Sequence, residues 1–169
     1  SSPTKSKVIL YIDEFTRYLD VEVGKDAIVL LNRLGYEVQL YFAESGRTFL
    51  SKGFLKQAKK LAKQNFLDLE EFTKEGHPVI GLEPSAILSF RDEYKRFFDN
   101  KSVADKVAVN CFLIEEFLSK EIDKGSIDSN AFTKNSCQVK IHAHCHQKAL
   151  SNQKITFDVL NLPENYEVT

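Results

Sequence analysis

Three histidines and one cysteine fall within five consecutive residues of the chain, as His142, His144, Cys145 and His146. Imidazole nitrogens and thiolates are the ligands that zinc and iron centres use, so these four residues form the candidate metal site. The alternating run 137–141 before them predicts a strand, and side chains on a strand alternate between its two faces. The three histidines would then share one face as far as the strand continues, with Cys145 on the other.

Three interpretations of this cluster remain open. The first is a zinc or iron site made by this chain alone. A closed site needs about four ligands in tetrahedral geometry, and one short turn could offer two or three of them. Alternatively, one or two of the histidines cap the strand end or bind buried carbonyl groups. The interpretation that we favour is that Cys145 becomes a ligand only in a longer protein, because nothing else in the chain completes the site.

Strand and helix patterns alternate along the chain, which predicts an α/β fold with a parallel sheet of four or more strands and helices on both faces, in Rossmann-like βαβ repeats. The sequence predicts strands at 8–12, 37–42, 78–82 and 137–141, and helices at 23–34, about 50–72, 84–97, 102–121 and about 147–160. Residues 124–136 are polar and include Gly, Ser and Asn, which is typical of a linker or an insertion.

Ligands of such sheets gather beyond the carboxyl ends of the strands. The polar residues Ser45, Gly46, Arg47 and Glu83 follow predicted strands, so they are the candidate cofactor-binding residues. Free amides near a helix start, together with a guanidinium, suit a carboxylate or a phosphate. The alternative is a structural turn in which Arg47 pairs with Glu44 or Glu83. Glu83 is expected near Arg47 and Arg91, and a salt-bridge network at this edge is our hypothesis. No catalytic residue is predicted.

Composition excludes several function classes. The net charge is -1 and there is no basic block, which argues against nucleic-acid binding. No apolar run approaches the roughly 18 residues of a transmembrane helix. The three cysteines have no regular spacing, which favours a reducing, cytoplasmic compartment. Cys111 is expected to be a small buried hydrophobic residue on a helix, and Cys137 a structural or free surface thiol.

The chain contains no methionine, and it ends in what reads as the start of another strand. We therefore expect it to be part of a longer polypeptide. The expected organisation is a linker or engineered remnant over 1–7, a first half over 8–100, a connecting helix and loop over 101–136, and the start of a truncated second half over 137–169.

Several motifs together resemble the cysteine-rich, CCG-type C-terminal domain of FAD-linked oxidase and iron–sulfur oxidoreductases, including D-lactate dehydrogenase-like and glycolate oxidase-like proteins. The similarity covers nearly all of the chain. It rests on Ser45-Gly46-Arg47 with 50–55, Gly81-Leu82-Glu83-Pro84-Ser85-Ala86, Phe90-Arg91-Asp92-Glu93-Tyr94, 115–118, and the run 142–150. The resemblance implies two similar βαβ halves, each of which contributes cysteines to one sheet edge for an iron–sulfur cluster or zinc.

The sequence departs from this family at the ligand positions. Family members commonly carry Cys-Cys-Gly-Arg where this chain has Glu44-Ser45-Gly46-Arg47, and a cysteine where it has Ala86. Iron–sulfur clusters need thiolates, so the first half is not expected to hold one. Cys145 matches a family ligand position, but the second Cys-Cys-Gly expected shortly after it is missing from this sequence.

By resemblance, the parent protein is expected to oxidise a 2-hydroxy acid of the D-lactate or glycolate type. Flavin would take the hydride and iron–sulfur centres would pass electrons on, so this chain would lie on the electron-transfer side. FAD is expected in a different domain, because the chain lacks a Gly-x-Gly-x-x-Gly fingerprint. The expected partners are the flavin and ferredoxin-like parts of the same polypeptide, with no nucleic acid and no transmembrane segment. The resemblance also allows a peripheral position at the inner face of a membrane. The alternatives are a cluster-free interaction or scaffold domain, and a small zinc-binding domain.

Overall fold

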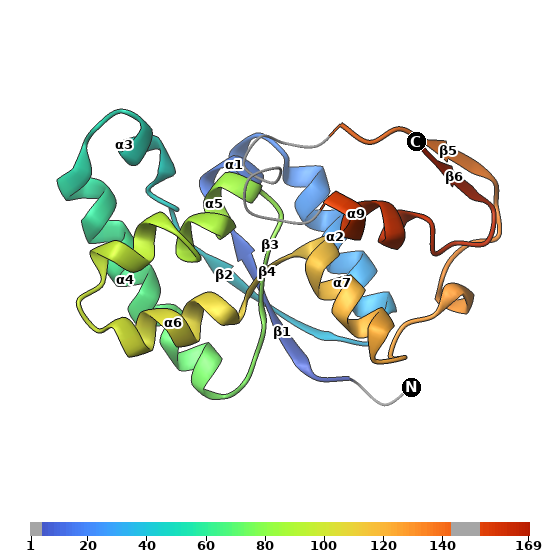
Figure 1. The fold of residues 1–169 in the computed structure, drawn as a ribbon, viewed down its shortest axis with the longest axis horizontal. Helices are drawn as coiled ribbons and strands as arrows, with labels where there is room; N and C mark the ends of the chain where they lie inside the picture. Colours follow the sequence, from blue (N-terminus) through green and yellow to red (C-terminus); the bar gives the residue numbers. More distant parts are fainter. Residues whose placement is uncertain (1–4, 143–152) are drawn as a thin grey trace. The chain divides into compact units, whose positions relative to one another are not determined.

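The computed structural model describes residues 5–142 and 153–169, and the chain divides into two compact units, Ser1–Leu113 and Ile114–Thr169. The first unit confirms the predicted fold class, because it holds a parallel sheet in the order β2-β1-β3-β4 (Figure 1). Its elements are β1 (Lys7–Ile12), α1 (Glu14–Tyr18), α2 (Val21–Arg33), β2 (Glu37–Phe42), α3 (Arg47–Ser51), α4 (Leu55–Lys74), β3 (Val79–Gly81), α5 (Pro84–Ile87), the 3-10 helices η1 (Leu88–Phe90) and η2 (Glu93–Phe97), α6 (Lys101–Val109) and β4 (Cys111–Leu113).

Strand β1 lies inside the sheet, between β2 and β3, as its continuous apolar run predicts. Val8, Ile9, Leu10 and Tyr11 are all fully buried, so neighbours cover both faces of the strand. Burying each such side chain contributes about 1.5–3 kcal/mol, which makes this strand the centre of the core. Strand β2 is its opposite, because it forms one end of the sheet and none of its residues is fully buried.

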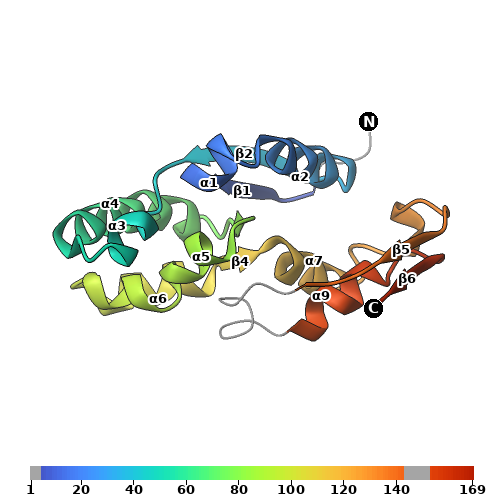
Figure 2. The same ribbon diagram turned by 90° about the horizontal axis from the view of Figure 1, so that it is seen from above.

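The two faces of the sheet are covered by different helices. On one face, the Tyr11 ring lies 5.7 Å from the ring of Phe90 in η1 and 5.8 Å from that of Tyr41. On the other face Ile12 meets α2, where a Cβ at Gly24 would lie at an ordinary contact distance of 3.9 Å from Ile12 Cδ1 but only 3.2 Å from Thr16 Cγ2 of α1. In Figure 2, α2 lies on one side of the strands and α4 on the other. Helices on both faces are what a parallel sheet of βαβ units requires.

The predicted single helix over 102–121 is wrong. The structure contains α6 (Lys101–Val109), then strand β4 (Cys111–Leu113), then α7 (Ile114–Asp123). Strand β4 pairs in parallel with β3, so Cys111 lies on a strand and not on a helix face. The prediction failed because the short apolar run of β4, between two helices, fits the spacing of a helix as well as that of a strand. The predicted helix over 84–97 is likewise divided, into α5, η1 and η2.

The second unit contains a small sheet of its own. Its elements within the described residues are α7, the 3-10 helix η3 (Ser129–Ala131), β5 (Cys137–Val139), α9 (Gln153–Leu160) and β6 (Tyr166–Val168). The strands predicted near 137–141 and near the end of the chain are confirmed as β5 and β6. They pair in parallel with each other, however, with Cys137 opposite Tyr166. The expectation that the strand before the His/Cys cluster joins the first sheet is therefore wrong.

None of the helices within 5–142 and 153–169 combines the length and the apolar character that crossing a bilayer requires.

Candidate functional site

The carboxyl ends of β1, β2 and β3 meet at one edge of the first sheet, because the register pairs Ile12 with Phe42 and Tyr11 with Gly81. Residues that follow these strands therefore gather at this edge, as predicted. We call this group the carboxyl edge, and it consists of Asp13, Glu14, Ser45, Gly46, Arg47 and Glu83. The candidate residues Ser45, Gly46, Arg47 and Glu83 thus share a common edge.

Ser45 is completely buried and is held by the carboxylate of Glu14. The Ser45 amide donates to Glu14 Oε2 over 2.7 Å, and the Ser45 hydroxyl donates to Glu14 Oε1 over 2.7 Å. The amide of Arg47 then donates to Ser45 Oγ over 3.0 Å. Hydrogen bonds to a carboxylate are among the stronger ones in proteins. The turn after β2 therefore already binds an anion, and that anion is a side chain that follows the neighbouring strand.

Arg47 pairs with Glu93, whose Oε1 accepts from the guanidinium Nη1 over 2.8 Å. Both side chains are largely buried, with 22% and 27% of their surfaces exposed. The predicted partners Glu44 and Glu83 are wrong, because η2 brings Glu93 to the arginine from a distant part of the chain. Glu83 has a different role, since its carboxylate accepts from the Ala86 amide over 2.7 Å and from the Ser85 hydroxyl over 2.8 Å. It is the N-cap of α5.

Gly46 has a φ of 80°, in the left-handed region that glycine adopts most readily. Its α-carbon also lies close to other elements. A Cβ at this position would lie 3.3 Å from both Leu61 Cβ and Tyr94 Oη, and 3.5 Å from the carbonyl oxygen of Ala58. The glycine is therefore required for two separate reasons: its backbone conformation and its tight approach to α4 and η2.

Asp13 is a residue of the edge whose role the sequence prediction missed. It is 1% exposed, and its Oδ1 accepts from the amides of Phe15 and Thr16 over 2.8 and 3.1 Å. Its Oδ2 accepts from the Thr16 hydroxyl over 2.9 Å. Burial raises the pKa of Asp13 above its ordinary value of 3.8, although these hydrogen bonds act in the opposite direction. The signal was available, because an aspartate directly before a helix is a preferred N-cap.

Two tyrosines lie beneath the edge, and both are fully buried. Among the described residues, neither Tyr11 Oη nor Tyr94 Oη has a hydrogen-bond partner. Burial raises the pKa of both phenols, and the nearby Glu14 carboxylate raises them further. For Tyr94, the Arg47 guanidinium acts on the pKa in the opposite direction. The phenols therefore stay protonated at the carboxyl edge at any physiological pH.

The atoms of the carboxyl edge that could bind a metal are carboxylate and hydroxyl oxygens. An iron–sulfur cluster needs thiolate ligands, so these oxygens do not fit one. Cys111 begins β4, opposite Val79 at the start of β3, so it lies at the other end of the strands. It is 1% exposed, and burial raises the pKa of its thiol to about 12. Its expected burial is confirmed. Ala86, where the resemblance implies a cysteine, is buried.

The predicted metal ligands His144, Cys145 and His146 lie outside the described residues. His142 is described, and it is an exposed residue just beyond β5. Within 5–142 and 153–169, no group of three or more His, Cys, Asp or Glu side chains is arranged to hold a metal ion. Cys137 is exposed and is not in a disulfide. The metal site at 142–146 therefore stays a prediction.

A hollow of about 220 Å³ lies beside the turn after β2 and is lined by Glu14, Glu44, Gly46, Thr48 and Phe49. Two of its five lining residues are carboxylates, so its electrostatic character is the reverse of the anion site that the sequence suggests. The carboxylates and turns of the edge bind parts of the same chain, as the Glu14–Ser45, Arg47–Glu93 and Glu83–Ala86 contacts show. The edge is thus built to hold the ends of three strands together.

Comparison with known proteins finds relatives among dehydrogenases. The chain is 36% identical over 103 residues to D-2-hydroxyglutarate dehydrogenase of Haemophilus influenzae, a match that covers 59% of this chain and 10% of the relative. It is 32% identical over 121 residues to the Escherichia coli enzyme of the same name, covering 70% of this chain and 12% of the relative. It is also 28% identical over 165 residues to a subunit of the anaerobic glycerol-3-phosphate dehydrogenase of Escherichia coli, covering 94% of this chain and 40% of the relative.

No family model and no solved structure matches the chain. Its relatives fit the oxidoreductase family that the motifs resemble, although the match to a CCG-type domain itself stays a prediction. The chain spans about a tenth of the length of the D-2-hydroxyglutarate dehydrogenases and 40% of the relative from glycerol-3-phosphate dehydrogenase. It is therefore similar to one portion of these larger dehydrogenases.

Proposed function

We propose that this chain is part of a flavin-linked dehydrogenase that oxidises a 2-hydroxy acid, and that its first unit is a cluster-free docking module of that enzyme. The names of the relatives support the reaction class, since they act on D-2-hydroxyglutarate and on glycerol 3-phosphate. The substrate would be a 2-hydroxy acid of the D-2-hydroxyglutarate, D-lactate or glycolate type. FAD would be bound in another domain, where it would take the hydride.

The observation that carries the role of the first unit is the Glu14–Ser45 contact. Where the resemblance implies adjacent thiolates, the chain places a buried serine whose amide and hydroxyl both donate to one carboxylate over 2.7 Å. A carboxylate held in this way and an arginine paired with Glu93 stabilise the edge without an iron–sulfur cluster. We infer that this unit lacks the thiolate ligands that an electron-transfer cluster needs. Its role would then be to position the neighbouring parts of the enzyme.

Any iron–sulfur centre of this chain would then depend on Cys145, the one cysteine at a family ligand position. Anaerobic reconstitution of the whole protein with iron and sulfide, followed by EPR and optical spectra, separates the two roles. We expect Ser45→Ala and Ala86→Ser to leave the cluster content unchanged, because neither position carries a ligand. A loss of cluster in Cys145→Ser places electron transfer in the second unit. A loss in Ser45→Ala would contradict the docking role of the first unit.

The reaction class is tested separately, by reduction of an artificial electron acceptor with each candidate substrate. We expect the whole protein to oxidise at least one of D-2-hydroxyglutarate, D-lactate and glycolate. Oxidation of glycerol 3-phosphate alone would contradict the proposed 2-hydroxy acid specificity. Metal analysis of the purified chain tests the remaining alternative, a small zinc-binding domain, which predicts stoichiometric zinc that is lost in Cys145→Ser.

A further inference from the structure

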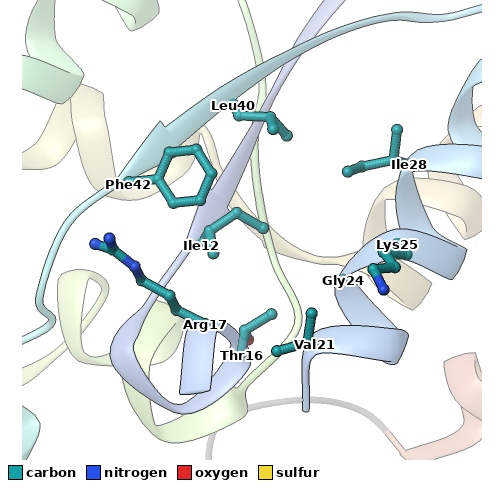
Figure 3. Close-up of a pocket in the computed structure, with 9 residues that line it drawn as sticks. All are labelled: Ile12, Thr16, Arg17, Val21, Gly24, Lys25, Ile28, Leu40 and Phe42. Atoms are coloured by element: carbon teal, nitrogen blue, oxygen red, sulfur yellow. The ribbon is translucent and has the colours of Figure 1, made fainter. Parts of the chain in front are cut away.

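An apolar groove lies between α1, α2 and strand β2, on the face of the sheet away from Tyr11. Its volume is about 170 Å³ and its walls are almost entirely apolar. Figure 3 shows Leu40 and Phe42 of β2, Ile28 and Val21 of α2 and Ile12 of β1 around it, with Arg17 of α1 at its rim. We call this the β2 groove, and Thr16, Gly24 and Lys25 complete its lining.

The groove exposes large apolar side chains to solvent. Phe42 is 53% exposed, Val21 44% and Leu40 39%. The neighbouring Tyr18 and Leu19, where α1 ends, are 67% and 74% exposed. Exposed large apolar side chains that gather around one groove are typical of interaction sites in soluble proteins. Its position supports this interpretation, because β2 is at one end of the sheet and, among the residues that the structure describes, pairs with a strand on one side alone.

The size of the groove limits what can fill it. A protein cavity of about 150 Å³ binds a benzene molecule, so 170 Å³ suits one aromatic ring or one branched aliphatic side chain. Gly24 lines the groove, and a Cβ at that position would lie 3.2 Å from Thr16 Cγ2, which is closer than an ordinary contact. The groove is therefore the size of a socket for a single large apolar side chain.

The charge at the rim of the groove indicates which kind of residue should lie next to that apolar side chain in the partner. The Arg17 guanidinium lies 5.2 Å from the Tyr18 ring and 5.7 Å from the Phe42 ring. Among the described residues no carboxylate forms an ion pair with Arg17, whereas the other cation at the rim, Lys25, pairs with Glu22 over 2.7 Å. A guanidinium that lies over aromatic rings beside an apolar socket is complementary to a carboxylate next to an apolar side chain.

We propose that the β2 groove binds a partner protein segment that carries one large apolar side chain beside a carboxylate. The partner is another part of the dehydrogenase assembly, and in that respect the proposal rests on the proposed function. A second copy of this chain fits less well, because a symmetric dimer would bring the same cations of both copies to one interface.

The chemistry of the groove is tested first with a small probe, 3-phenylpropanoate, which joins a phenyl ring to a carboxylate. We expect its titration into the full chain to shift the NMR signals of Leu40, Val21 and Phe42. The neutral 3-phenylpropanamide should bind about two- to fivefold more weakly, as should the acid to Arg17→Gln. Equal binding of acid and amide would overturn the role of Arg17, and an absence of shifts at these residues would overturn the groove as a binding site.

The occupant is tested by a photo-crosslinking amino acid placed at position 42 of the whole protein in its host cells. A matched control carries the same group at position 109, where the native Val109 is 69% exposed on α6. We expect position 42, and not 109, to crosslink a dehydrogenase segment that contains a large apolar residue next to Asp or Glu. A crosslink to a second, isotopically labelled copy, a crosslink to a segment without a carboxylate, or the same products from both positions would overturn the proposal.

These readouts do not depend on enzyme activity. If the protein oxidises no hydroxy acid but the probe and the crosslink behave as expected, only the proposed function fails. If activity is present and the groove binds neither probe nor partner, only the groove proposal fails.

Discussion

Replacing Gly46 by alanine tests whether the carboxyl edge is as tightly constrained as its geometry indicates. A residue with a Cβ costs about 1–2 kcal/mol in the left-handed region, and Gly46 has a φ of 80°. The new Cβ would also lie 3.3 Å from Leu61 Cβ, which is a backbone-proximal atom of α4 with little freedom to move. Overpacking of this kind costs about 1–3 kcal/mol. We therefore expect Gly46→Ala to lower the free energy of unfolding by about 2–5 kcal/mol.

The chain supplies a matched control in Gly53. Its φ is 79°, nearly the same, but a Cβ there would meet no atom within 4 Å. Gly53→Ala should therefore show the conformational cost alone, about 1–2 kcal/mol. The difference between the two variants isolates the cost of crowding at Gly46, which we expect to be about 1–3 kcal/mol.

Urea unfolding of the full chain, followed by far-UV circular dichroism, measures both values from the midpoint and the slope. A second variant, Tyr94→Phe, removes one of the two atoms that would lie 3.3 Å from the new Cβ. It also removes a buried hydroxyl without a partner among the described residues, so by itself it should be neutral or stabilising by up to about 1 kcal/mol. In the double variant, part of the loss at Gly46 should be recovered. Equal losses in Gly46→Ala and Gly53→Ala, within about 0.5 kcal/mol, would refute the argument from crowding.

Three further predictions concern other buried groups. Asp13→Asn keeps an N-cap but cannot ionise. Because burial raises the pKa of Asp13 in the folded chain, ionisation of the wild-type aspartate opposes folding. The stability of the variant relative to wild type should therefore rise as pH increases from 3.8 through the raised pKa, and then level off. Glu14→Ala should cost about 2–3 kcal/mol, because it leaves the buried Ser45 amide and hydroxyl without their acceptor, whereas Ser45→Ala should cost about 1 kcal/mol. Iodoacetamide at pH 8 should label Cys137 in minutes and leave Cys111 unlabelled until the chain unfolds, because burial raises the pKa of the Cys111 thiol to about 12.

Each of these has a contradicting result. For Asp13, urea unfolding at each pH measures the stability of the variant and of wild type. Equal changes in the two between pH 3.5 and 7 would contradict the prediction. The expected difference in free energy of unfolding is about 1.4 kcal/mol for each unit by which the pKa is raised. For Glu14, a smaller loss than for Ser45→Ala would show that the carboxylate does not hold the turn. For the thiols, peptide mapping that finds Cys111 and Cys137 labelled at equal rates in the folded chain would exclude the burial of Cys111.

Local patterns predicted much of the first unit. The continuous apolar run of β1 indicated a strand covered on both faces, and all four of its central residues, Val8 to Tyr11, are fully buried. Strand β2 has the predicted bounds, and β5 begins where the alternating pattern begins. These elements could be predicted from the sequence because a strand or helix that buries one or both faces needs apolar residues at a regular spacing. Strand β4 was missed because a three-residue strand is too short to show such a period.

The carboxyl edge was predictable as a place but not as a set of contacts. Once the order of strands and helices indicated a parallel sheet, the residues after β1, β2 and β3 had to lie at one edge. The sequence did not distinguish Glu93 from Glu44 or Glu83 as the partner of Arg47, because all three are acidic residues within reach of some plausible turn. Nor could it show that β5 pairs with β6 and not with the first sheet.

The sequence by itself therefore determined the fold class, the core strand and the absence of thiols from the Ser45 and Ala86 positions, because these depend on residue type and on local spacing. Tertiary structure decided which charges meet. The Ser45–Glu14 bonds join residues 31 apart in the chain, and the Arg47–Glu93 pair joins residues 46 apart. Such contacts depend on strand register and on how the helices return to the sheet, so chemically equivalent carboxylates acquire different partners only when the chain is folded.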